Sequence, residues 1–205
     1  SIDGPIKKDI AIDDYLSGGV SIYNDRSGDG NLANLSTLAS IAYHKFLGEE
    51  SKMALSVGLQ GGYTQKSIDL SRLYWQDEFK NGGFQPGTTG EQLNPKVKYF
   101  TANAGLSFQH AISENFSYQL GVAGHNLNQP NESLLKKANN EVGLGMRINA
   151  QLGAIIKGGE RLSIRPAFMY QTQTSATEMI AGSEFLYIVG EPDIQSVATG
   201  VFVGG

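Results

Sequence analysis

Hydrophobic and polar residues alternate along much of this chain. Met53, Leu55, Val57 and Leu59 occupy every second position, and the residues between them are small or polar. The same period continues through residues 142–154. A period of two places all the hydrophobic residues on one face of a strand. The predicted strands span residues 16–23, 33–46, 52–64, 98–110, 116–127, 142–156, 161–171, 177–188 and 197–205.

The length of these strands favours a membrane protein. Strands of soluble proteins have about 5–6 residues, whereas a tilted strand that crosses a membrane needs about 9–11. Aromatic residues near the strand ends, such as Tyr43, Tyr63 and Phe116, fit interfacial girdles. We therefore predict an all-β fold, a transmembrane antiparallel β-barrel, with residues 1–205 in a single domain.

The predicted connections alternate in length, as in outer-membrane barrels. Tight turns are expected at residues 47–51, 111–115 and 157–160. The connections between them are longer. They span residues 24–32, 65–97 and 128–141. The connection at 172–176 falls where a long loop is expected, but it is short.

Composition removes several classes of function. The 205 residues carry a net charge of -4, so no basic surface for nucleic acid is expected. The absence of cysteine excludes disulfides, thiolate metal sites and cysteine nucleophiles. No apolar stretch is long enough for a transmembrane helix. The mean hydropathy of -0.23 is compatible with barrel strands, which bury alternate residues in lipid.

No catalytic, cofactor or metal site is expected, and we predict that the protein is not an enzyme. His44, His110 and His125 lack metal-ligand spacing, and nothing in the sequence places a serine and a carboxylate beside any of them. Residues 25–30 imitate the start of a calcium loop, but position 36 is Ser instead of the expected Glu. A turn accounts for that segment better.

Two groups of residues are candidates for binding or for lining a lumen. In a barrel, the polar face would point inward, and four of its residues are predicted to face the lumen: Arg147, Asn149, Gln151 and Arg165. The two arginines would line a channel or, as we prefer, pair with Glu178 or Glu184 in an internal salt-bridge network. The loop at 65–97 carries aromatics that would bind a partner or plug the barrel mouth, two alternatives that stay open. These aromatics are Tyr74, Trp75, Phe79 and Phe84.

The order and spacing of several segments resemble the PorP/SprF family of outer-membrane barrels, which belong to the type IX secretion and gliding-motility machinery. The segments that carry the resemblance are residues 18–28, 39–44, 52–63, 68–71, 103–106 and 122–130. The resemblance implies a protein of the bacterial outer membrane that docks or anchors secreted adhesins. It also implies partners: the C-terminal domain of a secreted protein and other secretion or gliding-machinery proteins, with membrane lipid around the barrel.

The chain departs from the family pattern at both ends. It lacks the expected N-terminal segment rich in Asn-Pro, and residues 201–205 end as though inside a strand. We therefore expect an incomplete portion of a barrel. Two alternatives stay open, a passive diffusion channel and a soluble β-sandwich that acts as an adhesin or carbohydrate-binding module.

Overall fold

The fold is one large antiparallel sheet. The computed structural model describes residues 1–8, 10, 13–28, 30–48, 51–73, 75–80, 82–85, 93–134, 143–189 and 197–204, with only the backbone at 77, 80, 84, 189 and 197–204. Ten strands form the sheet, and each pairs with the next of the ten along the chain. They are β1 (Ile2–Lys7), β2 (Tyr15–Ser27), β3 (Leu32–Leu47), β4 (Met53–Ser67), β7 (Lys96–Ser113), β8 (Phe116–His125), β9 (Arg147–Gly158), β10 (Leu162–Gln173), β11 (Ala176–Val189) and β12 (Val197–Gly204).

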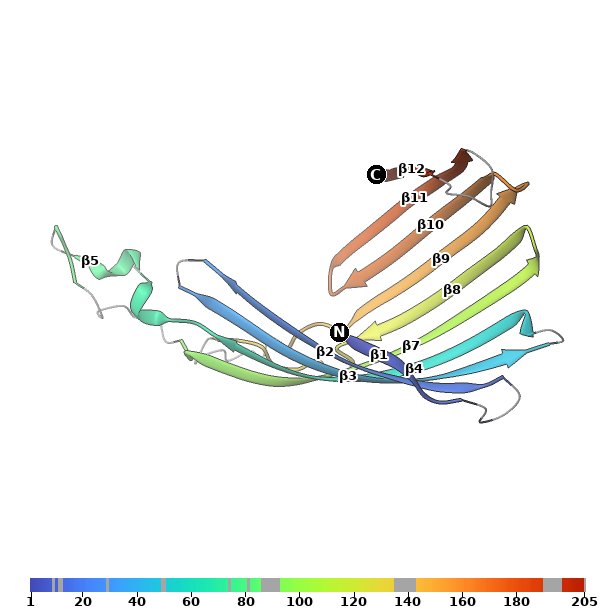
Figure 1. Ribbon diagram of the computed structural model, residues 1–205. Coiled ribbons are helices and arrows are strands. Elements are labelled where there is room, and N and C mark those ends of the chain that lie inside the picture. Colours follow the sequence, from blue (N-terminus) through green and yellow to red (C-terminus); the bar gives the residue numbers. More distant parts are fainter. Residues whose placement is uncertain are drawn as a thin grey trace.

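The connection between β4 and β7 has structure of its own. It contains the 3-10 turns η2 (Leu70–Arg72) and η3 (Gln76–Glu78). A two-stranded hairpin follows, formed by β5 (Phe79–Lys80) and β6 (Gly83–Phe84). Figure 1 shows this hairpin projecting well beyond the ends of β3 and β4. We call this end of the sheet, where residues 68–95 connect β4 to β7, the long-loop end, and the opposite end the short-turn end.

Each of the nine predicted strands corresponds to an observed one, but three details of the prediction were wrong. The segment predicted as a loop at 24–32 is mostly strand, because β2 stays paired with β3 as far as Ser27 and Leu32. The polar residues of this segment are typical of a turn. A strand that extends beyond the membrane can also carry polar residues at its end, because that end does not contact lipid. The strand predicted from residue 142 begins at Arg147. The edge strand β1 has no clear alternation and was not predicted.

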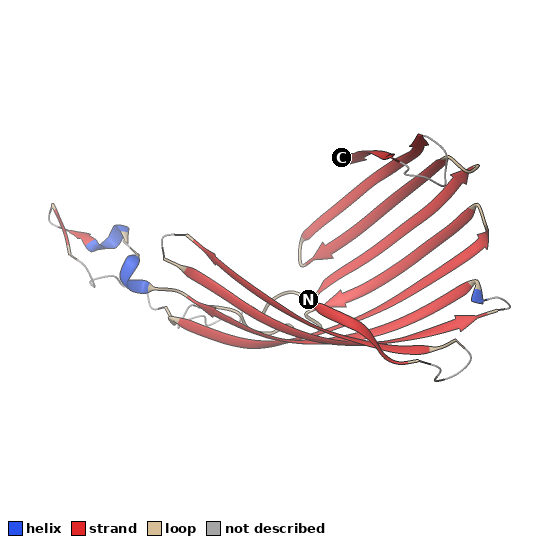
Figure 2. Ribbon diagram, in the orientation of Figure 1, coloured by secondary structure: helices blue, strands red, loops and turns tan. Residues whose placement is uncertain are grey.

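The sheet is strongly curved and open. In Figures 1 and 2 it sweeps from β1–β4 along the bottom to β9–β12 at the upper right, so that one face is concave. Its two edges are β1 and β12, which do not pair with each other. This open, curved sheet is consistent with a portion of a transmembrane barrel, the fold class that the sequence predicts.

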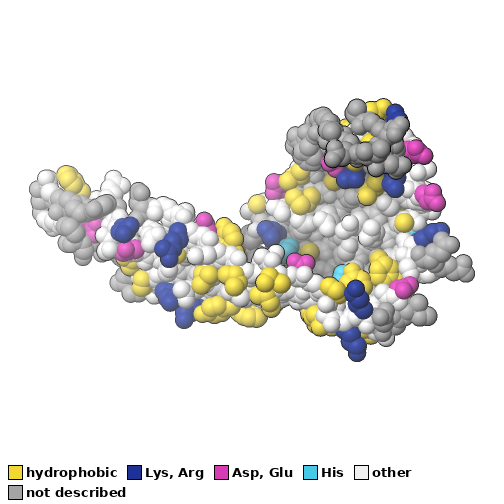
Figure 3. Space-filling model, in the orientation of Figure 1, with side chains coloured by type: hydrophobic (Ala, Val, Ile, Leu, Met, Phe, Trp, Pro, Cys, Tyr) yellow, Lys and Arg dark blue, Asp and Glu magenta, His cyan; other side chains and the backbone are white. Residues whose placement is uncertain are grey.

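The two faces of the sheet differ in chemistry. Strand register places Leu59 beside Ile41 and Ala104 on one face, which we call the apolar face. Gln60 lies beside Ser40 and Asn103 on the other, the polar face. Figure 3 shows hydrophobic side chains along the lower outer side and mostly polar or small ones in the hollow above. Large hydrophobic residues stay exposed along the apolar face, among them Val20, Ile22, Leu59, Phe100, Leu120, Leu152 and Phe168.

The described part of the chain has no buried hydrophobic side chain, so these strands enclose no apolar core. A soluble β-sandwich buries the inner faces of two sheets against each other. Here the exposed apolar face has no second sheet against it among the described residues, which argues against the sandwich alternative. No helix in the described ranges is long and apolar enough to cross a membrane.

Candidate functional site

The polar face forms a hollow whose lining includes several amide side chains and a histidine. Gln60, Asn103, His125, Asn149 and Gln151 all line it. Asn103 Nδ2 donates a hydrogen bond to Gln60 Oε1 at 2.9 Å across β4 and β7. Small residues also line the hollow, among them Ala42, Gly58, Gly105, Gly121 and Ala123, and their lack of bulk keeps it open. The result is a surface of neutral donors and acceptors suited to polar, uncharged groups.

The two arginines predicted for this face have different surroundings. Arg165 forms an ion pair with Glu184 at 3.4 Å, one of the two pairings considered from the sequence. Both side chains are close to half exposed, so this pair adds at most about 1 kcal/mol to stability. Glu178 instead accepts a hydrogen bond from Gln171 Nε2 at 2.7 Å. Arg147 lies opposite His125 in the register, and its buried Nε has no hydrogen-bond partner among the described atoms.

Residues 126–134, which we call the strap, cover part of the edge of β7. The pairing of β7 with β8 stops at Ala104 and Gly124, whereas β7 itself begins at Lys96. The first residues of β7 therefore lack a strand partner on that side. Unpaired strand edges are commonly covered by a loop.

Hydrogen bonds hold the strap on that edge. Leu127 N donates to Ala102 O at 2.8 Å. The Asn128 amide accepts from Ala102 N at 3.0 Å and donates to Phe100 O at 2.6 Å. The Asn128 side chain thus replaces backbone hydrogen bonds that a neighbouring strand would make with β7. At the far end, Asn94 N donates to Leu134 O at 2.6 Å.

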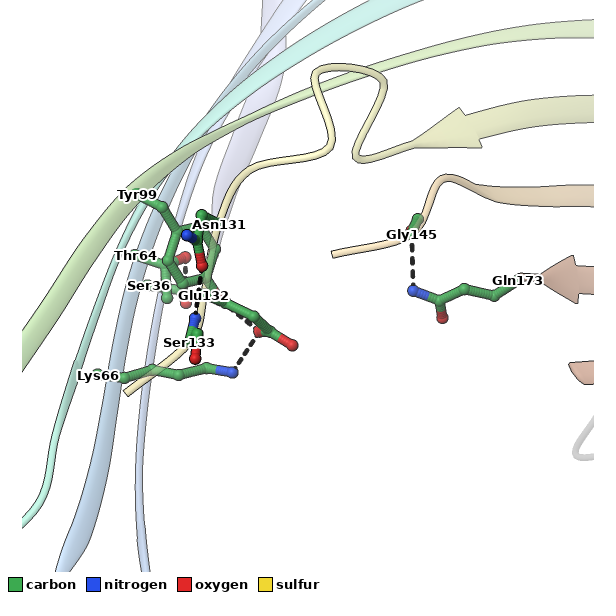
Figure 4. Close-up of polar contacts among 9 residues, drawn as sticks. All are labelled: Ser36, Thr64, Lys66, Tyr99, Asn131, Glu132, Ser133, Gly145 and Gln173. Carbon is green, nitrogen blue, oxygen red and sulfur yellow. Dashed lines mark hydrogen bonds and ion pairs between the residues drawn. The ribbon is translucent and has the colours of Figure 1, made fainter. Parts of the chain in front are cut away.

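Glu132 fixes the strap to the polar face. Lys66 Nζ reaches Glu132 Oε2 at 2.5 Å, and the Tyr99 hydroxyl donates to the same oxygen at 3.4 Å (Figure 4). Ser36 and Thr64 share a hydrogen bond of 2.9 Å in the same view. Because Lys66, Thr64 and Tyr99 lie on the polar face, Glu132 of the strap lies on that face, at its long-loop end, and not on the apolar face.

His44 has two serine partners that the sequence did not indicate. Its Nε2 lies 2.9 Å from Ser17 Oγ, and its Nδ1 lies 2.8 Å from Ser56 Oγ. Tyr15 stacks on the imidazole with ring centroids 4.3 Å apart. The pattern of one strand does not predict these serine contacts, because they arise from the pairing of β3 with β2 and β4. No carboxylate contacts His44 among the described residues, so this is not the Ser-His-Asp arrangement of a hydrolase.

Asp14 forms a clasp at the short-turn end. It is only 1% exposed. It accepts hydrogen bonds from the Tyr43 hydroxyl at 2.5 Å and from Phe46 N at 2.9 Å. Lys45 Nζ lies 3.7 Å from the same carboxylate. The bonds from Tyr43 and Phe46, with the charge of Lys45, hold the pKa of Asp14 below its usual range, although burial opposes them.

The connection between β4 and β7 is held together by short polar contacts. Asp69 accepts from Ser71 Oγ at 2.6 Å and from Ser71 N at 3.1 Å, and these bonds hold the pKa of its carboxyl below the usual range. Glu78 is buried, and Trp75 N donates to it at 3.2 Å. Phe79 is 65% exposed on the hairpin and Trp75 is half-buried. Of the other two predicted aromatics, Tyr74 lies outside the described residues, and only the backbone of Phe84 is described.

A single curved antiparallel sheet with an exposed apolar face and a polar, glycine-rich face defines the class of outer-membrane β-barrel proteins. The family described as "Type IX secretion system membrane protein PorP/SprF" matches residues 1–189. The chain belongs to this family, which the sequence resemblance predicted, and it is a type IX secretion component of the outer membrane. Searches of the curated proteins and of the solved structures found no significant match. The family is a component of a secretion system and not a known enzyme family.

Two features of the polar face could not be found from the pattern alone. The strap, residues 126–134, overlaps residues 122–130, one of the segments on which the family resemblance rests, but those residues do not indicate that they cover the edge of β7. The contact of Lys66 with Glu132 has no local signal either, since the two residues lie 66 positions apart along the chain. Among the described residues, no group of three His, Cys, Asp or Glu side chains is placed to hold a metal ion.

Proposed function

We propose that this type IX secretion component docks a secreted adhesin-like protein at the cell surface. Its partners in this role are the C-terminal domain of the secreted protein and other proteins of the secretion and gliding machinery. The role is non-enzymatic. The apolar face contacts lipid, and the polar face, with Arg147, Asn149, Gln151 and Arg165, lines the interior of the barrel.

The observation that carries this proposal is the projecting hairpin at the long-loop end. Long loops of outer-membrane barrels face the cell exterior, so the hairpin would meet secreted proteins there. Phe79 presents an exposed aromatic ring at its start. Buried aromatic anchors commonly dominate the binding energy of protein interfaces. In Figure 1 the hairpin extends away from the sheet, which favours contact with a partner over a plug in the hollow.

The polar hollow supports a second candidate function, a passive diffusion channel. Its neutral amides would allow small polar solutes to pass. The strap disfavours this role, because Glu132 holds it across the polar face. Conductance of the full-length protein in planar bilayers separates the two functions. A steady, large conductance supports the channel, and its absence supports docking.

The docking proposal is tested by replacing the hairpin aromatic. Full-length tagged protein carrying Phe79→Ser is expected to retain about tenfold less secreted protein when outer membranes are solubilised and purified, because truncated hot-spot side chains cost about 1–4 kcal/mol. Tyr23→Ser is the matched control, because this residue is also an exposed aromatic but lies on β2. Equal recovery of secreted protein with Phe79→Ser and with the control would overturn the assignment of the hairpin.

A further inference from the structure

Three cations lie on the apolar face at its long-loop end. The register aligns Arg26 of β2 with Ala33, Ser67 and then Lys96 of β7 in one row across four strands. Lys98 lies in the next row, in line with Gln65. All three cationic residues are exposed. They belong to the face that carries the hydrophobic residues, and not to the polar hollow.

The next row toward the middle of the strands lies at the edge of the hydrophobic band, the part of the apolar face that carries exposed hydrophobic residues. Ile22, Thr37, Tyr63 and Phe100 align across the same four strands, and Ile22, Tyr63 and Phe100 are exposed. Tyrosine and phenylalanine at such an edge mark the level of lipid headgroups in barrels. The cations begin one row beyond, where the phosphates of a bilayer lie.

No acidic residue in the described part of the chain neutralises these cations. Arg26, Lys96 and Lys98 form no ion pair among the described residues. On the apolar face, the described strand residues between β2 and β11 include no Asp or Glu. The other end of this face differs, because there Lys45 lies 3.7 Å from Asp14. On the described apolar face of β2 to β11, the lysines and arginines without an ion pair therefore all lie at the long-loop end, in a chain with a net charge of -4.

The spacing suits phosphate. Lys96 and Lys98 point the same way from one strand, about 7 Å apart, and Arg26 lies three strands away, about 14 Å. Gln65 and Ser67, on β4 between them, add hydrogen-bonding groups. Flexible lysine and arginine side chains reach across such gaps to a shared phosphate. The acyl chains of a lipid bound there would lie along the hydrophobic rows that begin with Ile22, Tyr63 and Phe100.

We propose that Arg26, Lys96 and Lys98 form a binding site for the phosphate-bearing headgroup of an anionic lipid, with its acyl chains along the apolar face. This site is separate from the docking role, since its residues lie on β2 and β7 and not on the hairpin of β5 and β6. It would hold the long-loop end of the barrel at a fixed depth in the membrane. Figure 3 shows Lys and Arg side chains immediately to the left of the hydrophobic band.

The test uses full-length protein in neutral detergent with equal phosphatidylglycerol and phosphatidylcholine. Native mass spectrometry measures which lipid stays bound. Wild type is expected to retain phosphatidylglycerol preferentially, and the triple variant Arg26→Gln, Lys96→Gln, Lys98→Gln is expected to lose this preference, by about fivefold for each cation removed. The control variant Lys7→Gln, Lys157→Gln, Arg161→Gln removes three exposed charges from the short-turn end and is expected to behave as wild type.

Two further measurements keep the proposal falsifiable. The single reversal Lys98→Glu is expected to weaken retention without three simultaneous changes, and heat-dependent migration in gels checks that each variant is folded. Excess inorganic phosphate is expected not to displace the lipid, because the acyl chains contribute to binding. Equal losses in the two triple variants, or complete displacement by inorganic phosphate, would overturn the lipid site.

Discussion

The two faces of this sheet are made by the same strands, yet one carries hydrophobic residues and the other carries small and polar ones. On β4, Val57 and Leu59 are exposed on one face, and Ser56, Gly58 and Gln60 line the hollow on the other. Among the described residues no second layer of structure packs on the apolar face, whereas the polar face carries the contacts of Glu132 and His44. Alternation in this sheet therefore separates two environments, lipid and barrel interior, instead of separating a protein core from water.

The largest predicted effect comes from placing a charge on each face at neighbouring positions. Leu59→Arg is expected to destabilise the barrel in a bilayer by about 2–4 kcal/mol, because the cation would face hydrocarbon. Gln60→Arg, one residue along, is expected to cost less than about 1 kcal/mol, since it points into the hollow. Reversible urea unfolding of the full-length protein in lipid vesicles measures both. Equal costs would mean that the faces do not differ as described.

A smaller effect is predicted for the strap. Glu132→Gln removes the charge that binds Lys66 and is expected to loosen the strap by about 1 kcal/mol, a value reduced because both side chains are partly exposed. Hydrogen exchange of the amides in residues 126–134 measures this opening. Glu184→Gln, which breaks the more exposed pair with Arg165, is the control and is expected to leave strap exchange unchanged. Unchanged exchange in Glu132→Gln would show that the ion pair with Lys66 does not hold the strap.

The smallest predicted effect concerns acid at the short-turn end of the apolar face. The pKa of Asp14 is lowered from its ordinary 3.8 by Tyr43 and Phe46, so the folded protein favours the charged carboxylate. Its contribution to stability is therefore full above about pH 4 and is lost as the pH falls through the folded pKa. Asp14→Asn is expected to be less stable than wild type at neutral pH, with the gap narrowing in acid. A gap that is constant from neutral to acid pH in thermal unfolding would contradict this.

The period of two predicted most of the fold, because alternation directly reflects which side of a strand meets lipid. Strand ends were harder to place. Asn24, Asp25 and Arg26 read as a turn, but pairing with β3 extends the strand through them. The edge strand β1 contains Gly4 and Pro5 and no regular alternation, so its pairing with β2 had no local signal.

The polar contacts of the site were predicted only in part. The pairing of Arg165 with Glu184 was anticipated from the polar face that they share. The strap exists because β8 is shorter than β7 at the long-loop end and leaves the first residues of β7 without a strand partner. No local sequence pattern indicates this difference in length. The burial of Asp14 likewise depends on strand ends 29 residues apart along the chain. Such features arise from register between strands and not from the residues of one strand.

The most direct test of the account is a scan of single cysteines along β4 in the full-length protein, which is practical because the described chain contains no cysteine. Each cysteine at positions 55–60 carries a spin label, and its accessibility to oxygen in lipid and to a water-soluble nickel complex is measured. Labels at Leu55, Val57 and Leu59 are predicted to be accessible to oxygen, and those at Ser56, Gly58 and Gln60 to the nickel complex. Uniform accessibility, or alternation in the opposite sense, would contradict the assignment of the two faces.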